Sequence, residues 1–257
     1  MEMTRSISPP PLSGVVITLN EADRIGRCVA SLKAVCAEVL VLDSGSTDDT
    51  VRIAEEAGAR VVTQPWLGFA GQKNAAIAMA TFPWVLLLDA DEWLDPGHLD
   101  RIRSLFASGG HEAADVWRLH RRTHYLGTTL DHGGWGREPV DRLFRNTLRY
   151  RSALVHEALD LSGCRVRRLD VRVEHDTARS DAEYAAKLER YAALWARQRH
   201  RAGKRACPWD PALHASAYWL KSYILRGGFR DGPMARRYHA LHAQYVYRKY
   251  QVLRQAR

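Results

Sequence analysis

The stretch Trp84-Val-Leu-Leu-Leu-Asp-Ala-Asp-Glu92 decides the fold, because five apolar residues run directly into a carboxylate-rich segment. A short apolar run of this kind predicts a strand that is buried on both faces. Asp89 and Asp91 then lie together at its carboxyl end. Two like charges so close require a cation, and paired carboxylates with room for phosphate oxygens suit Mg²⁺ or Mn²⁺. An isolated Asp-x-Asp is more often a solvated turn, so the neighbouring segments must decide.

Strand and helix patterns alternate before this stretch. Apolar, β-branched runs predict strands, and apolar residues at helical spacing predict the helices between them. Ser46-Thr-Asp-Asp49 supplies N-cap chemistry for a helix that stops at Gly58. The expected strands are 14–19, 39–42 and 60–63, and the expected helices are 21–34, 50–58 and 71–80. Alternation of this kind predicts a parallel sheet with helices on both faces.

Polar residues follow three of the expected strands. They are Thr18-Leu-Asn-Glu21, Asp43-Ser-Gly-Ser46 and Asp89-Ala-Asp-Glu92. Ligands of open α/β sheets bind at the carboxyl ends of the strands, where loops and helix N-termini converge. We therefore expect these side chains to form one binding edge.

The rest of the chain is expected to form an acceptor half and a helical extension. A helix at 96–108, strands at 115–120 and 140–144, a glycine-rich stretch at 131–136, and helices near 181–201, 210–226 and 233–254 are predicted. The expected domains are a catalytic domain, 1–178, with a nucleotide-binding half, 14–95, and an acceptor half, 96–178, followed by an extension, 179–257. The extension is basic, with 17 Lys and Arg against 5 Asp and Glu. We therefore expect an anionic partner to be attracted to this part of the chain.

Composition bounds the classes of function. The chain has 257 residues, a net charge of +9 and four widely spaced cysteines without a Cys-x-x-Cys pair, which favours reduced thiols and a cytoplasmic protein. The N-terminus lacks the apolar stretch of a secretory signal, and no apolar run approaches the roughly 18 residues of a spanning helix. Gly-x-Gly-x-x-Gly after the first strand and a P-loop are both missing, which argues against a dehydrogenase or a P-loop enzyme.

In combination, Val16-Ile-Thr-Leu-Asn-Glu21, Val41-Leu-Asp-Ser-Gly-Ser46, Gly71-Gln-Lys-Asn-Ala75 and Leu88-Asp-Ala-Asp-Glu92 resemble family 2 glycosyltransferases of the GT-A fold. The resemblance implies a metal-dependent glycosyltransferase with a Rossmann-like mixed α/β sheet and a C-terminal helical extension. It also implies roles for single residues. Asp43 would contact the uracil or ribose, Asp89 the ribose and a metal-bound water, and Asp91 the metal, Mg²⁺ or Mn²⁺. The remaining donor-binding residues would be Thr18, Asn20, Glu21, Ser44, Lys73 and Asn74.

Inversion at the sugar requires a base that takes the acceptor hydroxyl's proton. Asp141 is favoured, because Asp141-Arg-Leu-Phe-Arg145 resembles a stretch of a bacterial lipopolysaccharide core glycosyltransferase subgroup. Glu138 is a close second, and either carboxylate could instead be an ion-pair partner of Arg137 or Arg142. Val155-His-Glu157 also matches the subgroup. His156 could ligate the metal, stabilise the diphosphate or order a loop, and Glu157 competes for the role of base.

The C-terminal stretches Tyr223–Gly232 and Tyr245–Tyr250 resemble the same subgroup. The resemblance implies transfer of one sugar, with inversion, from a nucleotide donor onto a lipopolysaccharide inner-core or other lipid-linked saccharide. UDP-glucose is the single donor we expect. Two alternatives are a polyprenyl phosphate acceptor, against which the lack of spanning helices counts, and a sugar-phosphate nucleotidyltransferase. The latter would carry a Gly-rich basic loop where this chain has Asn20-Glu-Ala-Asp-Arg24.

Aromatic and basic residues mingle in the extension. The aromatic residues are Trp195, Tyr218, Trp219, Tyr223, Phe229 and Tyr247. Aromatic residues beside arginines can hold a helix at a lipid interface, so one expectation is peripheral attachment to the anionic inner face of the cytoplasmic membrane. The alternative, that they pack a helical subdomain, stays open. A nucleic-acid partner is not expected, because the basic residues lie away from the Asp-rich strand ends and no nucleic-acid-binding motif is present.

Overall fold

The computed structural model describes residues 9–151 and 157–256. Contacts within the chain define two compact units. Unit 1 comprises residues 1–120, 139–152 and 158–173, and unit 2 comprises 121–138, 153–157 and 174–257. Unit 2 thus joins part of the expected acceptor half to the C-terminal helices.

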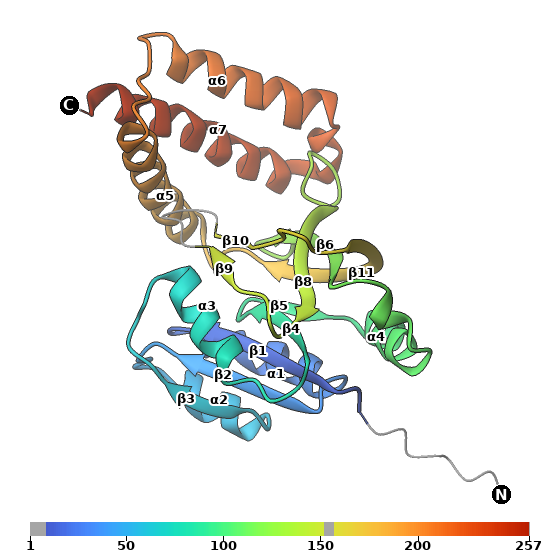
Figure 1. The fold of residues 1–257 in the computed structure, drawn as a ribbon. Coiled ribbons are helices and arrows are strands. Elements are labelled where there is room, and N and C mark those ends of the chain that lie inside the picture. The colour runs from blue at the N-terminus through green and yellow to red at the C-terminus, as the bar shows by residue number, and fades with distance from the viewer. Residues whose placement is uncertain (1–8, 152–156, 257) are drawn as a thin grey trace, which may run out of the picture. The chain divides into compact units, whose positions relative to one another are not determined.

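Unit 1 is built on a mixed sheet (Figure 1). Its strand order is β3-β2-β1-β4-β8-β6-β11-β5. The strands are β1 (Leu12–Thr18), β2 (Glu38–Asp43), β3 (Arg60–Thr63), β4 (Trp84–Asp89), β5 (Glu92–Leu94), β6 (Val116–Tyr125), β8 (Glu138–Arg145) and β11 (Val166–Asp176). β1 pairs in parallel with β2 and β4, whereas β8 runs antiparallel to β4. The predicted mixed α/β sheet is confirmed.

Helices cover both faces of this sheet. They are α1 (Ile25–Lys33), α2 (Thr50–Glu56), α3 (Phe69–Ala78), α4 (Pro96–Ala107) and the 3₁₀ turn η1 (Gly110–Ala113). Alternate residues of β4 enter two separate apolar clusters: Leu86 lies in the cluster that contains α1 and α4 residues, and Leu87 in the one that contains α3 residues. β4 is therefore buried on both faces, as its apolar run predicts. Each fully buried leucine contributes about 1.5–3 kcal/mol, so this strand anchors the unit.

Three short strands remain: two form a separate ribbon, and one lies at the end of the main sheet. β9 (Tyr150–Arg151) pairs antiparallel with β10 (Ala158–Leu159). β7 (Thr128–Leu130), in unit 2, pairs antiparallel with the last residues of β6. None of these short strands was expected from the sequence.

Unit 2 is mainly helical. Its elements are α5 (Asp181–Arg201), α6 (Asp210–Tyr218), the π-helical segment η2 (Trp219–Leu225), the 3₁₀ turn η3 (Gly228–Asp231) and α7 (Gly232–Gln255). The three helical segments expected from the sequence are confirmed, although the middle one passes from α- to π-geometry at Trp219. Of the helices in the described part of the chain, none combines the length and hydropathy needed to cross a bilayer.

The core of unit 2 is aromatic and contains histidines. The ring of Tyr184 stacks on that of Tyr238 at 5.5 Å, and its hydroxyl lies 2.7 Å from Nε2 of His242. Burial lowers the pKa of His239 to about 4, against the opposing charge of Asp231. Burial lowers the pKa of His242 to about 3, and the charge of His239 adds to the effect. Both rings are therefore neutral in the folded chain at pH 7.

These two histidines predict an acid-sensitive unit. Their folded pKa values lie below the ordinary value of 6.5, so the unfolded chain binds more protons as the pH falls below about 6.5, and stability drops toward pH 4. Each pKa unit corresponds to about 1.4 kcal/mol. Urea unfolding between pH 7.5 and 4.5 should show this slope, and His242→Gln should reduce it. An equal slope in wild type and variant would contradict the assignment.

Candidate donor-binding site

The carboxyl ends of β1, β2 and β4 meet at one edge of the sheet. The parallel register sets Thr18 of β1 beside Asp43 of β2, and Ile17 beside Asp89 of β4. The expected meeting of Thr18, Asp43 and Asp89 at one edge is thus what the structure shows.

Asp43 holds the turn that follows β2. Its Oδ2 accepts the backbone N–H groups of Gly45 and Ser46, each at 2.8 Å, and its Oδ1 accepts the Ser46 hydroxyl at 2.5 Å. Gly45 has a φ of +96°, which side chains other than glycine rarely allow. The carboxylate thereby rigidifies the loop that carries Ser44.

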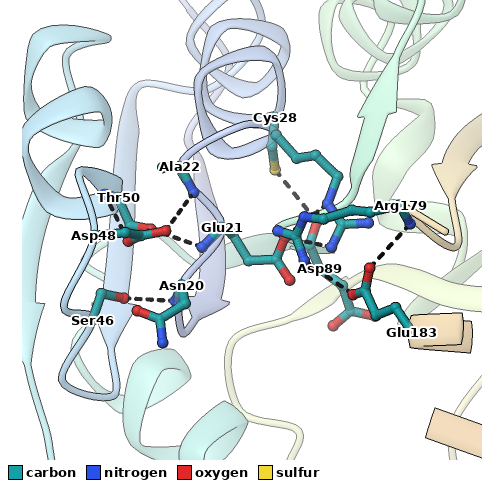
Figure 2. A network of polar contacts seen from close by, with 11 residues as sticks. Asn20, Glu21, Ala22, Cys28, Ser46, Asp48, Thr50, Asp89, Arg179 and Glu183 are labelled. Carbon is teal, nitrogen blue, oxygen red and sulfur yellow. Dashed lines mark hydrogen bonds and ion pairs between the residues drawn. The ribbon is translucent and has the colours of Figure 1, made fainter. Parts of the chain in front are cut away.

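The loops after β1 and β2 are locked to each other, as Figure 2 shows. The N–H of Asn20 donates to Ser46 Oγ at 2.9 Å, and its Oδ1 accepts the N–H of Thr47 at 2.9 Å. The N–H of Glu21 donates to Thr50 Oγ1 at 2.7 Å. Asn20 adopts a φ of +55°, a conformation that asparagine tolerates better than most residues. The two loops therefore form one rigid rim at the strand edge.

Thr18 and Asn74, two residues expected to bind the donor, differ in the hydrogen bonds of their side chains. Thr18 is buried, and its hydroxyl has no hydrogen-bond partner among the described residues. Asn74, by contrast, uses both ends of its amide on the backbone of Tyr150: Nδ2 donates to the carbonyl at 2.9 Å, and Oδ1 accepts the N–H at 2.7 Å. Asn74 thus fixes β9, and Thr18 offers an unused hydroxyl at the edge.

Asp89 is held between two cations. Nζ of Lys73 lies 3.2 Å from its Oδ1, and Nη2 of Arg142 lies 2.5 Å from its Oδ2. Both cations are buried, whereas the side chain of Asp89 is 32% exposed. The carboxylate is therefore oriented from beneath and remains accessible to a ligand from the solvent side.

Glu92 completes a buried network around Arg142. Its side chain is fully buried; Oε1 lies 2.6 Å from Nη2 of Arg142, and Oε2 accepts the backbone N–H of Asp89 at 3.1 Å. Burial works against the charge of Arg142, but Asp89 and Glu92 outweigh it and raise the pKa of the guanidinium well above its usual value. Arg142 and Glu92 therefore fix both the backbone and the carboxylate of Asp89.

Three carboxylates, those of Asp89, Asp91 and Glu92, follow one another at the end of β4, where the two cations also lie. Cys28 lies beneath the strand end and donates to the carbonyl of Asp89 at 3.5 Å. Burial raises the pKa of this thiol, and the charges of Glu92, Asp91 and Asp89 raise it further, while Arg142 opposes them as the weakest contribution. Asp91 is half-buried in the turn between β4 and β5. A hard divalent cation fits such a carboxylate-rich edge.

The described residues contain no group of three or more His, Cys, Asp or Glu side chains arranged to hold a metal. His156, the third metal ligand expected from the sequence, lies outside the described residues. Of the three metal ligands expected from the sequence, the structure describes Asp89 and Asp91, at the end of β4 and in the turn that follows it.

The carboxylates expected on the acceptor side are ion-paired. Asp141 receives two hydrogen bonds from Arg118, at 2.7 and 3.0 Å, and this bond raises the pKa of Arg118. Successive strand residues project to opposite faces, so Asp141 leaves β8 on the side opposite Arg142 and the Asp89 network. In unit 2, Glu138 pairs with Arg121 at 2.7 Å.

The remaining features that the sequence assigned to the acceptor side lie in unit 2. Glu157 is half-buried at the start of the segment that leads into β10. Gly133, in the glycine-rich stretch, has a φ of +71°, and a Cβ there would lie 2.5 Å from the ring of His239. The glycine at this position is therefore required by close packing against α7.

The sequence offered Arg142 only as an ion-pair partner of Asp141 or Glu138, whereas it pairs with Asp89 and Glu92; Glu92 and Gln72 had no separate role. Gln72 is fully buried and donates to Ser44 Oγ at 3.1 Å and to the carbonyl of Gln64 at 3.2 Å, so it ties α3 to the loops after β2 and β3. The available signal for Arg142 was its place directly before the apolar pair Leu143-Phe144 of a strand, because a buried cation requires a carboxylate partner.

Comparisons with known proteins agree with this geometry. Residues 13–174 match the family "Glycosyl transferase family 2". An uncharacterized glycosyltransferase of Rickettsia felis is 50% identical over 97 residues, which cover 38% of this chain and 34% of the relative. The lipopolysaccharide core biosynthesis glycosyltransferase LpsC of Rhizobium meliloti is 31% identical over 236 residues, which cover 86% of this chain and 84% of LpsC.

A solved structure shares the fold. The mannosyltransferase PcManGT of Pyrobaculum calidifontis, determined with GDP-Man and Mn²⁺, superposes with a TM-score of 0.56 at 15% identity over 98% of this chain and 89% of its own. At this identity the likeness supports the GT-A fold alone. Together with the family match over more than half of its length, these findings make the chain a GT-A glycosyltransferase that belongs to family 2.

Proposed function

We propose that this glycosyltransferase moves one sugar, with inversion, from a nucleoside diphosphate donor onto a lipopolysaccharide inner-core or other lipid-linked saccharide. UDP-glucose is the proposed donor. The observation that carries the proposal is the Asp89 network, in which buried Lys73 and Arg142 hold an accessible carboxylate beside Asp91 at the edge where β1 and β2 also end.

The donor pocket is proposed at the rim formed by the loops after β1 and β2. The buried, unpartnered hydroxyl of Thr18, within the described residues, is a group that a nucleoside could satisfy. Asn20 and Glu21 hold the adjoining backbone, and Asp43 shapes the loop that carries Ser44. The ammonium of Lys73 lies beside Asp89, where it can also attract a diphosphate oxygen.

Asp91, Asp89 and His156 are the proposed holders of Mg²⁺ or Mn²⁺. The carboxylates of Asp89 and Asp91 are hard oxygen ligands of the kind that such ions prefer, and PcManGT was determined with Mn²⁺. When bound, the ion would supply positive charge against the leaving nucleoside diphosphate. Arg142 and Glu92 keep Asp89 in place while that charge changes.

The acceptor proposal rests on LpsC, whose name assigns it to lipopolysaccharide core biosynthesis and which aligns with most of this chain. A polyprenyl phosphate carrier is the second candidate acceptor. Transfer assays with isolated core oligosaccharide and with polyprenyl phosphate separate the two acceptors.

The proposed base is one of Asp141, Glu138 and Glu157. The neutral variant of the true base should lower kcat about 10²–10⁴-fold with the Kd of the donor nearly unchanged, because only proton transfer is lost. The other two should keep kcat, and Asp141→Asn or Glu138→Gln should then lower thermal stability through the lost arginine pair. Steady-state kinetics with donor titration distinguishes these patterns. Retention of kcat by all three variants would contradict the proposal.

The donor is tested by calorimetric titration of UDP-, GDP-, ADP- and dTDP-sugars with Mn²⁺, with Mg²⁺, and with a chelator. We expect UDP-glucose to bind most tightly and to lose its affinity when the metal is removed. Tighter binding of another nucleotide would replace UDP in the proposal, and metal-independent binding and transfer would remove the metal.

A further inference from the structure

The outward side of α6 and η2, in unit 2, is apolar. We call it the apolar helix face; its exposed residues are Trp209, Ala212, Leu213, Ser216, Ala217, Leu220, Lys221, Ile224 and Leu225. Lys221 is its one charged member. Trp209 is 65% exposed and Leu225 75% exposed. A surface helix normally turns charged and polar residues to the solvent, and an apolar face of this kind is typical of an interaction surface.

The inward side of the same segment carries the polar and aromatic groups. The hydroxyl of Tyr218 lies 3.0 Å from Nδ1 of buried His239, and Ser222 is buried. The rings of Trp219 and Tyr223 pack at 4.4 Å. Of the aromatic residues that the sequence suggested as interface groups, Tyr218, Trp219 and Tyr223 are thus partly buried in this segment. Aliphatic residues face outward instead.

Cations flank the apolar helix face along the chain. Lys204 and Arg205 precede it, Arg226 and Arg230 follow it, and all four are exposed. Between residues 204 and 230 the only acidic residue is Asp210, whose carboxylate already accepts the N–H of Cys207 at 2.7 Å. A second copy of this chain docked face to face would bring these cations against one another, with only Asp210 of each copy's segment to offset them.

We propose that the apolar helix face docks onto an anionic lipid bilayer, with the helix lying in the interfacial plane. Leu213, Leu220 and Ile224 enter the boundary between headgroups and acyl chains, and Trp209 sits at headgroup depth, as tryptophan prefers. The flanking cations contact lipid phosphates. The proposal stands on unit 2 alone and does not depend on which sugar or acceptor the enzyme uses.

The test is flotation of the full chain with vesicles of phosphatidylcholine alone or mixed with phosphatidylglycerol. We expect binding to the mixed vesicles only, weakening as salt rises. Leu213→Gln with Ile224→Gln should lower the binding constant at least about tenfold. Val166→Gln, at an exposed apolar position of unit 1, is the matched control and should leave it unchanged.

Charge reversal tests the contribution of the cations to membrane binding. Lys204→Glu with Lys221→Glu should lower binding to the mixed vesicles about tenfold or more, whereas Arg167→Glu with Arg168→Glu, at exposed positions of β11, should lower it less. Sugar transfer to a soluble oligosaccharide should remain in the apolar variant, which separates failure of the surface from failure of the enzyme.

Three results would overturn the proposal. They are no binding to mixed vesicles at low salt, equal binding by the Leu213/Ile224 variant, and light scattering that shows a dimer which this variant converts to monomer without any change in vesicle binding. The last result would assign the face to a second copy of the chain.

Discussion

Replacing Asp91 with asparagine should lower sugar transfer about 100-fold or more and leave the fold intact. Asp91 lies half-buried in the turn after β4, two residues after Asp89 and directly before Glu92. The substitution removes one negative charge from an edge that already contains the positive charges of Lys73 and Arg142. A divalent cation would then be held far less tightly. Initial rates and donor affinity at increasing Mn²⁺ concentration measure the loss.

Asp100→Asn is the matched control for that variant. Asp100 is an exposed carboxylate on α4 whose partner is Arg103, so its neutral form should transfer sugar at the wild-type rate. Unchanged metal dependence in Asp91→Asn would show that this carboxylate does not hold the ion.

Arg142→Met should destabilise unit 1 by about 3–5 kcal/mol, the usual result of leaving a buried charge without its partner. Glu92 is fully buried beside Arg142, and Asp89 loses the cation that orients its Oδ2. Urea unfolding followed by far-ultraviolet circular dichroism gives the free energy. Transfer should also fall in the fraction that remains folded, because Asp89 would lose its position.

A double-mutant cycle separates the network from simple packing. Glu92→Gln with Arg142→Met should be less destabilising than the two single changes added together, because the double variant leaves fewer buried charges unpaired. Arg52→Met, at an exposed ion pair on α2, should cost less than about 1 kcal/mol. Additive losses in the cycle would mean that Arg142 and Glu92 do not act as one unit.

The nucleotide-binding half of the fold could be predicted because its strands are nearly continuous apolar runs. β3 occupies the residues predicted, and β4 extends the prediction only by Asp89. Helix α1 begins at Ile25, four residues later than expected. The backbone carbonyl of Glu21 accepts the N–H of Arg24, and this hydrogen bond closes a turn before the helix begins. Local hydrogen bonds of this kind are not visible in the spacing of apolar residues.

β11 was missed for a different reason. Its first residues, Val166-Arg-Arg-Leu-Asp170, are charged and mostly exposed, and only its second half is buried. Such a strand has no regular alternation, so pairing with neighbours in the sheet, rather than local pattern, determines it.

The candidate site was predicted in its placement more than in its contacts. The strand ends locate Thr18, Asp43 and Asp89, because parallel strands must share an edge. The partners of Asp89 come from α3 and β8, Lys73 and Arg142, and only tertiary packing brings them there. The arginines paired with Asp141 and Glu138 are Arg118 and Arg121, not the sequence neighbours Arg142 and Arg137.

The central claim is that this edge of the sheet binds a nucleotide sugar, and that binding and transfer both depend on a metal ion. The most direct measurement is transfer of labelled glucose from UDP-glucose to isolated lipopolysaccharide core oligosaccharide, with Mn²⁺ and with a chelator, by wild type and by Asp91→Asn. The account predicts labelled product only from wild type with metal. Equal product from the variant, or from wild type with the metal chelated, would contradict it.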